Sequence, residues 1–150
     1  MAVSARRRTL EQLLDEARAR IDRLEPDAAF SAADRGALII DIRSPVERER
    51  DGIVPGSLHI PRTVLEWRLD PDSASRNPHV RSLDQQIVLI CDHGCSSLLA
   101  AATLADLGFT RASDIIGGFA AWREAGLPTT QPIPYRLDSG EPAGMRPPDP

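Results

Sequence analysis

Short apolar runs alternate with helix-forming segments along this chain, and that alternation does most to narrow its possible folds. Ala37 to Ile42 and Ile87 to Cys91 are almost continuously apolar, as are strands buried on both faces of a parallel sheet. Two shorter runs, Ser57 to Pro61 and Ala112 to Ile116, are also typical of strands. Strands that alternate with helices predict an α/β layer fold with a mainly parallel sheet. In such folds, functional groups lie beyond the carboxyl ends of the strands.

Helix signals fill the segments between these strands. Thr9 and Gln12 have capping-box spacing ahead of an amphipathic segment that continues to Leu24. Ser44 begins another helix, with a proline at the first helical position and a glutamate placed to close a capping box. Further helices are expected over residues 27–34, over 63–69, from the loop after Cys91 to about Leu107, and over 119–125.

Length and composition limit the number of domains, the kinds of partner and the cellular location that we expect. A chain of 150 residues forms one domain with a real core. We divide it into an N-terminal amphipathic helix (1–25), an α/β domain (26–130) and a proline-rich, flexible tail (131–150). A net charge of −4 argues against nucleic acid and acidic membranes as partners. No apolar run approaches the roughly 20 residues that span a bilayer. Arg6 to Arg8 are not followed by an apolar run of the kind that a signal peptide has. We therefore expect a cytoplasmic protein.

The chemistry centres on Cys91, which ends an apolar strand and precedes a polar loop and an alanine-rich helix. Free backbone N–H groups and the positive end of the helix dipole gather at such a junction and favour a thiolate. Gly94 allows the loop to turn tightly. The alternative is an unreactive core cysteine, which is common after a strand. The loop that follows favours a nucleophile.

Four segments together resemble a single-domain rhodanese, and the resemblance covers roughly Phe30 to Thr130. The segments are Asp41–Arg43, Asp51–Pro61, Cys91–Ser97 and Gly117–Trp122. The resemblance implies a three-layer fold with a five-stranded, mainly parallel sheet flanked by helices. It also implies that Cys91 accepts a sulfane sulfur as a persulfide and passes it to a thiophilic acceptor. The loop residues Asp92, His93, Gly94, Cys95, Ser96 and Ser97 would bind that persulfide.

The loop departs from the family at one position. Many rhodaneses have an arginine five positions after the cysteine, whereas this chain has Ser96, followed by Ser97. Asp92 adds a negative charge beside the nucleophile instead. We therefore expect thiosulfate, a dianion, to be a weaker donor than a less charged persulfide. The arginines that could approach from other loops are Arg43, Arg48 and Arg62.

The remaining polar residues receive mainly supporting roles. Asp41 and Arg43 are expected to pair with each other or with the Arg62 region, because buried charges need partners. His59 is predicted to be structural, Trp67 to border the site and Trp122 to pack in the core.

Two loop residues carry further alternatives. Cys95 is either a space-filling residue or a resolving thiol for oxidised Cys91. His93 either assists the thiol or faces solvent. Cys91, His93 and Cys95 are too closely spaced for a typical zinc site and have no evident fourth ligand, so we predict neither a metal nor a cofactor.

Three functions remain in competition. The first is a sulfurtransferase that takes sulfur from a small sulfane donor, thiosulfate or a persulfide, and gives it to a thiol, cyanide or an acceptor protein. The second, a phosphatase or arsenate reductase of the same fold, needs a loop one residue longer that ends in arginine, and this chain has Ser97 there. The third is a non-catalytic or redox-sensing module that binds a partner protein.

Overall fold

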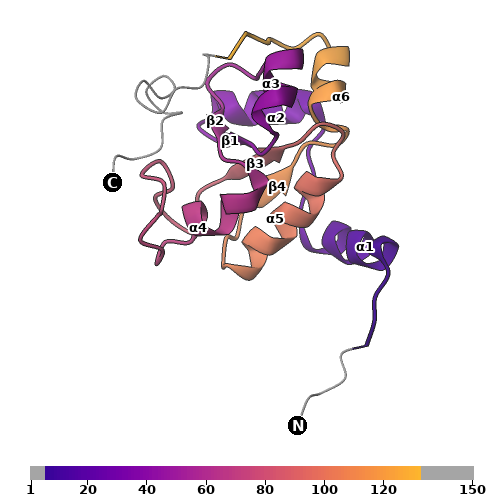
Figure 1. Cartoon of the computed structure of the whole chain (residues 1–150), viewed down its shortest axis with the longest axis vertical. Helices are drawn as coiled ribbons and strands as arrows, with labels where there is room; N and C mark the ends of the chain where they lie inside the picture. The colour runs from indigo at the N-terminus through magenta and orange to yellow at the C-terminus, as the bar shows by residue number, and fades with distance from the viewer. Residues whose placement is uncertain (1–5, 133–150) are drawn as a thin grey trace.

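A parallel sheet forms the middle layer of the protein, which a computed structural model describes over residues 6–132 (Figure 1). Its spatial order is β2-β1-β3-β4. The strands are β1 (Leu38–Asp41), β2 (Leu58–His59), β3 (Ile87–Ile90) and β4 (Ala112–Asp114). All four residues of β3 are buried, as expected for an apolar strand between two helical layers.

The expectation of five strands is wrong for the described residues, in which the sheet has four. A single parallel bridge between Leu24 and Ile115 lies where a fifth strand would extend the sheet beyond β4. There the Leu24 amide donates to the Asp114 carbonyl at 2.9 Å, and the Ile116 amide donates to the Leu24 carbonyl at 2.9 Å. Pro26 has no N–H and begins the next helix, so the pairing cannot continue.

Two groups of helices cover the two faces of the sheet, and each packs in its own apolar cluster. The first face carries α1 (Leu10–Arg20), α4 (Leu65–Leu69) and α5 (Ser96–Asp106). The second carries α2 (Pro26–Asp34) and α6 (Gly118–Glu124), where the predicted core residue Trp122 is buried. A short α3 (Pro45–Asp51) follows β1, and a 3-10 turn, η1 (Arg62–Val64), precedes α4.

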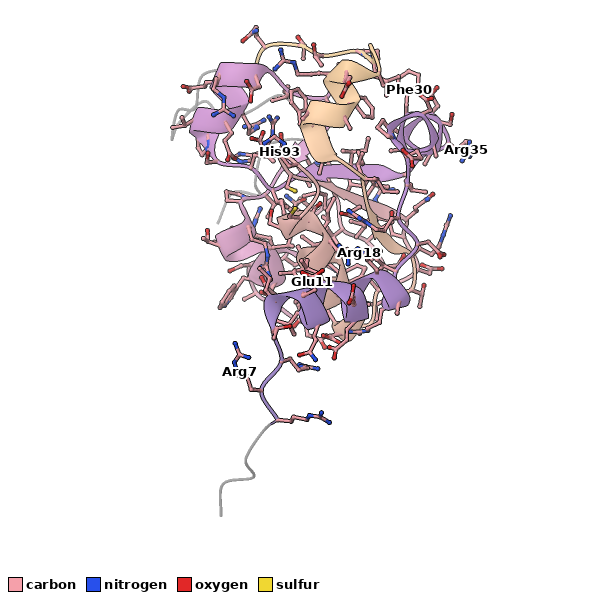
Figure 2. All side chains as sticks on the ribbon, turned by 90° about the vertical axis from the view of Figure 1, so that its right-hand side faces the viewer. Arg7, Glu11, Arg18, Phe30, Arg35 and His93 are labelled. Atoms are coloured by element: carbon pink, nitrogen blue, oxygen red, sulfur yellow. The ribbon has the colours of Figure 1, made fainter. Side chains whose placement is uncertain are left out.

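The helix bounds follow the sequence signals closely, and the clear exception is the end of α1. Both predicted capping boxes are present, at Thr9 with Gln12 and at Ser44 with Glu47. Helix α1 ends at Arg20 instead of continuing to Leu24, because the backbone of Ile21 is extended. Figure 2 shows Glu11 and Arg18 on the outer side of α1, and Arg7 on the segment that leads into it.

The predicted tail lies outside the described residues except for 131 and 132. Over residues 6–132, no helix has the length and apolar character needed to cross a membrane.

Candidate active site

The structure places Cys91 directly after β3, at the carboxyl end of the sheet and one short loop ahead of α5. Its side chain is 5% exposed, and its sulfur faces the loop. The Gly94 amide lies 3.1 Å from Cys91 Sγ and the Ser97 amide 3.3 Å from it, both as donors. Ser97 Oγ is 3.2 Å from the same sulfur. We call Gly94 and Ser97, whose amides face the sulfur, the cradle.

The cradle favours the ionised sulfur. Burial by itself raises the pKa of the Cys91 thiol. Hydrogen bonds with the side chains of Ser96 and Ser97 and from the amides of Ser97 and Gly94 outweigh burial, so the pKa lies below that of an ordinary cysteine. A thiolate that faces backbone donors is a nucleophile.

Gly117 and Gly118, at the start of α6, pack against the loop that holds Cys91. The amides of Phe119 and Ala120 donate to the carbonyls of Cys91 and Asp92, at 2.8 and 3.1 Å. A Cβ atom on Gly118 would lie 2.5 Å from the Cys91 carbonyl oxygen and 2.7 Å from the Gly94 nitrogen, so the two backbones touch only because position 118 lacks a side chain. Helix α6 therefore binds the carbonyls of Cys91 and Asp92, which point away from the amides of the cradle.

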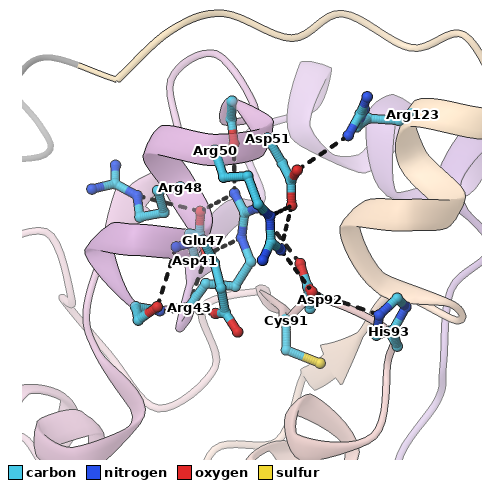
Figure 3. Close-up of polar contacts among 12 residues, drawn as sticks. Asp41, Arg43, Glu47, Arg48, Arg50, Asp51, Cys91, Asp92, His93 and Arg123 are labelled. Atoms are coloured by element: carbon cyan, nitrogen blue, oxygen red, sulfur yellow. Dashed lines mark hydrogen bonds and ion pairs between the residues drawn. The ribbon is translucent and has the colours of Figure 1, made fainter.

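Arg43, in the loop after β1, and Arg50 of α3 reach Asp92 rather than the sulfur (Figure 3). Arg43 is buried against Asp41, with Nη2 2.9 Å from Oδ2, and its guanidinium lies 4.0 Å from the centre of the Phe119 ring. Its Nη1 has no hydrogen-bond partner among residues 6–132 and lies 3.9 Å from Asp92 Oδ1. Arg50, which the sequence analysis did not single out, places Nη2 3.3 Å from Asp92 Oδ2. The Asp92 carboxylate thus already occupies the position that these cations face.

The other predicted site residues are more dispersed. His59 Nε2 lies 2.8 Å from the Arg43 carbonyl oxygen. Arg62 pairs with Glu66 at 2.8 Å, one turn along the chain, and not with Asp41. Trp67 is 62% exposed on α4. The His93 side chain is 74% exposed and lies 3.6 Å from Asp92 Oδ2.

Both thiols are free, and they differ in access. Cys91 is buried, whereas Cys95 is exposed at the N-cap of α5. The resolving role of Cys95 stays a prediction.

Sequence reasoning missed two residues beside the cradle, Arg23 and Asp114. They form a salt bridge whose Nε–Oδ1 distance is 2.8 Å. Asp114 had one usable signal, since a carboxylate inside the apolar run from Ala112 to Ile116 needs a buried partner. Nothing local marked Arg23 as that partner, because the two residues are 91 positions apart.

Sheet and loop together define a class of α/β proteins in which a cysteine that follows a central strand faces backbone amides of the next loop and helix start. The match to a family model, the rhodanese-like domain, spans residues 14–125. The chain belongs to the family of single-domain rhodanese-like sulfurtransferases.

Three relatives illustrate the similarity. A thiosulfate sulfurtransferase GlpE from Pseudomonas syringae is 36% identical over 101 residues, which cover 67% of this chain and 86% of the relative. A solved structure from Rhodopseudomonas palustris has 38% sequence identity and a TM-score of 0.76, and the match covers 87% of this chain and all of the R. palustris chain. That protein is of unknown function and is described as a possible tyrosine phosphatase. The polysulfide-sulfur transferase of Wolinella succinogenes has 25% identity and a TM-score of 0.62, covering 83% and 89%.

Proposed function

We propose that this protein transfers sulfane sulfur and that Cys91 is its carrier. The observation that carries the proposal is the cradle, in which the amides of Gly94 and Ser97 converge on Cys91 Sγ at 3.1 and 3.3 Å. Together with the side chains of Ser96 and Ser97, these amides lower the pKa of the thiol, and the loop contributes no arginine or lysine to that shift. A persulfide anion on the same sulfur needs the same kind of donors.

The reaction has two displacements. The Cys91 thiolate attacks the sulfane sulfur of the donor, an S–S bond forms on Cys91, and the donor's own S–S bond breaks. With thiosulfate, the bonding electrons of that S–S bond leave with sulfite; with a persulfide, they leave with the donor thiolate. The acceptor then attacks the outer sulfur, takes it, and returns Cys91 as a thiolate. A thiol acceptor becomes a persulfide and cyanide becomes thiocyanate, so no external oxidant or reductant is required.

The charges around the loop favour a donor with little negative charge. Ser96 leaves the loop without a guanidinium. Of the cations near the site, Arg43 and Arg50 face Asp92, and Arg23 is paired with Asp114. We propose a persulfide or polysulfide as the better donor and thiosulfate as a weaker one. The GlpE relatives are named for thiosulfate and the Wolinella relative for polysulfide, so both donor classes occur among similar proteins.

Phosphatase chemistry has less support, although the relative from R. palustris is described as a possible tyrosine phosphatase. That reaction needs an arginine that binds the phosphoryl oxygens, six positions after the cysteine. Ser97 stands there, with its hydroxyl bound to Asp114 at 2.7 Å. Ser97 therefore offers no guanidinium for a bidentate contact with a phosphoryl group.

The test is the intact mass of the protein after incubation with thiosulfate or with a small-molecule persulfide, followed by removal of the donor. We expect the wild type to gain one sulfur, and to lose it again when a thiol acceptor is added. Cys91→Ser should gain none, because a serine hydroxyl is not ionised at neutral pH. Cys95→Ser serves as the matched control and should still gain sulfur.

Two results would contradict this assignment. One is a sulfur that remains on the Cys91→Ser protein while the fold, checked by circular dichroism, is intact. The other is a wild type that takes up no sulfur from either donor, which would favour a redox-sensing or partner-binding module.

A further inference from the structure

The salt bridge between Arg23 and Asp114 lies outside the loop that holds Cys91. Arg23 precedes the Leu24 bridge to the sheet, and Asp114 is the last residue of β4. The guanidinium binds the carboxylate twice, at 2.8 Å from Nε to Oδ1 and at 3.0 Å from Nη2 to Oδ2. Asp114 is fully buried, and the Arg23 side chain is mostly buried.

Each partner of this pair also binds one residue of the cradle. Arg23 Nη2 donates to the Gly94 carbonyl at 2.8 Å. The Ser97 hydroxyl donates to Asp114 Oδ2 at 2.7 Å. Gly94 and Ser97 are the two residues whose amides face the Cys91 sulfur. The pair is thus tied to both sides of the cradle at once.

We propose that the Arg23–Asp114 pair is a positioning unit that fixes both cradle residues against Cys91, and so stabilises the thiolate and, if the proposed function holds, the persulfide that follows. Arg23 fixes the plane of the peptide between Gly94 and Cys95 by holding its carbonyl oxygen. The Gly94 amide that faces Cys91 Sγ belongs to the preceding peptide, so Arg23 restrains it through the Gly94 Cα that the two planar peptides share. Preorganised donors of this kind stabilise charge without moving during the reaction.

Asp114 sets the orientation of the Ser97 hydroxyl. That hydroxyl has one hydrogen and two neighbours, Asp114 Oδ2 at 2.7 Å and Cys91 Sγ at 3.2 Å. The nearer carboxylate takes the hydrogen while the thiol is neutral, and the thiol then donates to Ser97 Oγ. Asp114 thereby holds Ser97 at the start of α5, with its backbone amide directed at the sulfur.

Arg23 also supplies a nearby positive charge, which the loop itself lacks. The pKa of Arg23 is raised first by its hydrogen bonds to Asp114, against the effect of burial, and further by attraction to Asp114, Cys91 and Cys95. The other ionisable groups around Cys91 are Asp92, His93 and Cys95 on its own loop, Asp114 on β4, and Arg43 and Arg50, which act through Asp92.

The experiment measures the rate at which iodoacetamide alkylates Cys91 as a function of pH. Tandem mass spectrometry of the tryptic peptide spanning residues 82–111 assigns the label to Cys91 or Cys95. The principal variant is Arg23→Lys, which keeps the charge beside Asp114 but cannot bind two carboxylate oxygens and a carbonyl with one planar fork. Arg23→Gln removes the charge as well. The matched control is Arg20→Gln, which removes an arginine whose partner is the exposed Asp106.

We expect the pH midpoint of Cys91 alkylation to rise by about 0.5 to 1 unit in Arg23→Lys and by more in Arg23→Gln, since each unit reflects a tenfold loss of thiolate. Arg20→Gln should match the wild type. A purely structural role would lower the melting temperature of the Arg23 variants but leave the midpoint of the folded protein in place. An Arg23→Lys protein that is folded and has the wild-type midpoint overturns the proposal.

Sulfur uptake by the same proteins separates this inference from the proposed function. If the wild type takes up no sulfur but the midpoint still shifts in the Arg23 variants, the positioning of the thiolate stands and only sulfur transfer fails. If the wild type takes up sulfur and the midpoint does not shift, sulfur transfer stands and the positioning role fails.

Discussion

At the scale of single residues, Ser96 most clearly sets this loop apart from its family. Other arginines lie near the site, but each is engaged: Arg43 with Asp41 and Arg62 with Glu66. Ser96 itself is exposed at the first position of α5. A longer side chain therefore has room there and would begin at the mouth of the loop.

Installing the missing guanidinium as Ser96→Arg should improve the use of thiosulfate. The added charge binds the dianion equally in the ground and transition states, so we expect KM to fall about tenfold with little change in kcat. Ser96→Gln, similar in length but uncharged, is the control, and it also loses the Ser96 hydroxyl. If Arg and Gln at position 96 give equal KM values in folded proteins, the loop does not bind anionic donors in the family's manner.

At the scale of secondary-structure elements, the sequence was most informative where the evidence lay within a few residues. The capping boxes at Thr9 and Ser44 are local hydrogen-bond patterns, and both are present. The strand–loop–helix unit around Cys91 was also readable, because a buried strand and an alanine-rich helix have distinct compositions. By contrast, the fifth strand came from family resemblance alone, and Pro26 leaves a single bridge in its place.

Contacts between distant elements were beyond this kind of reasoning. Arg23 resembles any other arginine in a chain that has no lysine, and its partner Asp114 lies 91 residues away. Arg50 has the same difficulty, since its contact with Asp92 joins α3 to the loop after β3. Charge and hydropathy patterns along the chain indicate which residues are buried, but they do not indicate which buried charges form pairs.

The contact between α6 and the loop predicts a strong effect for Gly118→Ala. The new Cβ would lie 2.5 Å from the Cys91 carbonyl oxygen, and the backbone at φ +63° disfavours a side chain. We expect a loss of about 3 kcal/mol or more in the free energy of unfolding, measured with urea, since the clash adds to the left-handed strain. Alkylation of Cys91 in the folded fraction should also slow.

Gly126→Ala, just beyond the same helix, is the matched control. Its φ is +72°, but a Cβ there would meet nothing within 4 Å. We therefore expect only the conformational cost, about 1 kcal/mol, and normal alkylation. Similar losses for the two variants would mean that the loop does not rest closely on α6.

At the scale of the whole molecule, ionisation of Cys91 is coupled to folding. The cradle holds the pKa of Cys91 below that of the thiol in the unfolded chain. Between these two pKa values the unfolded state binds more protons than the folded state, so the free energy of unfolding rises with pH across that interval. Below the folded pKa this contribution is absent, and above the unfolded pKa it is fully present.

Urea denaturation at a series of pH values tests this coupling. Across the interval, the wild type should gain stability relative to Cys91→Ser, which has no ionisable group at position 91. The difference between the two proteins removes the contribution of all other groups. Parallel curves would mean that the thiol has the same pKa in the folded and unfolded states.

The separation in sequence between the segments that build the cradle has a consequence for a chain during synthesis. Cys91 lies well past the middle of the chain. The residues that hold its cradle lie on both sides of it in the sequence, at Arg23 and at Asp114. The contacts between α6 and the loop also need Gly118 and Phe119, which follow later still. Parallel strands joined by crossovers also pair late, because loop closure must precede their contacts. A nascent chain that has just exposed Cys91 therefore carries an ordinary thiol. Its reactivity toward sulfur compounds and oxidants arises only after α6 has docked.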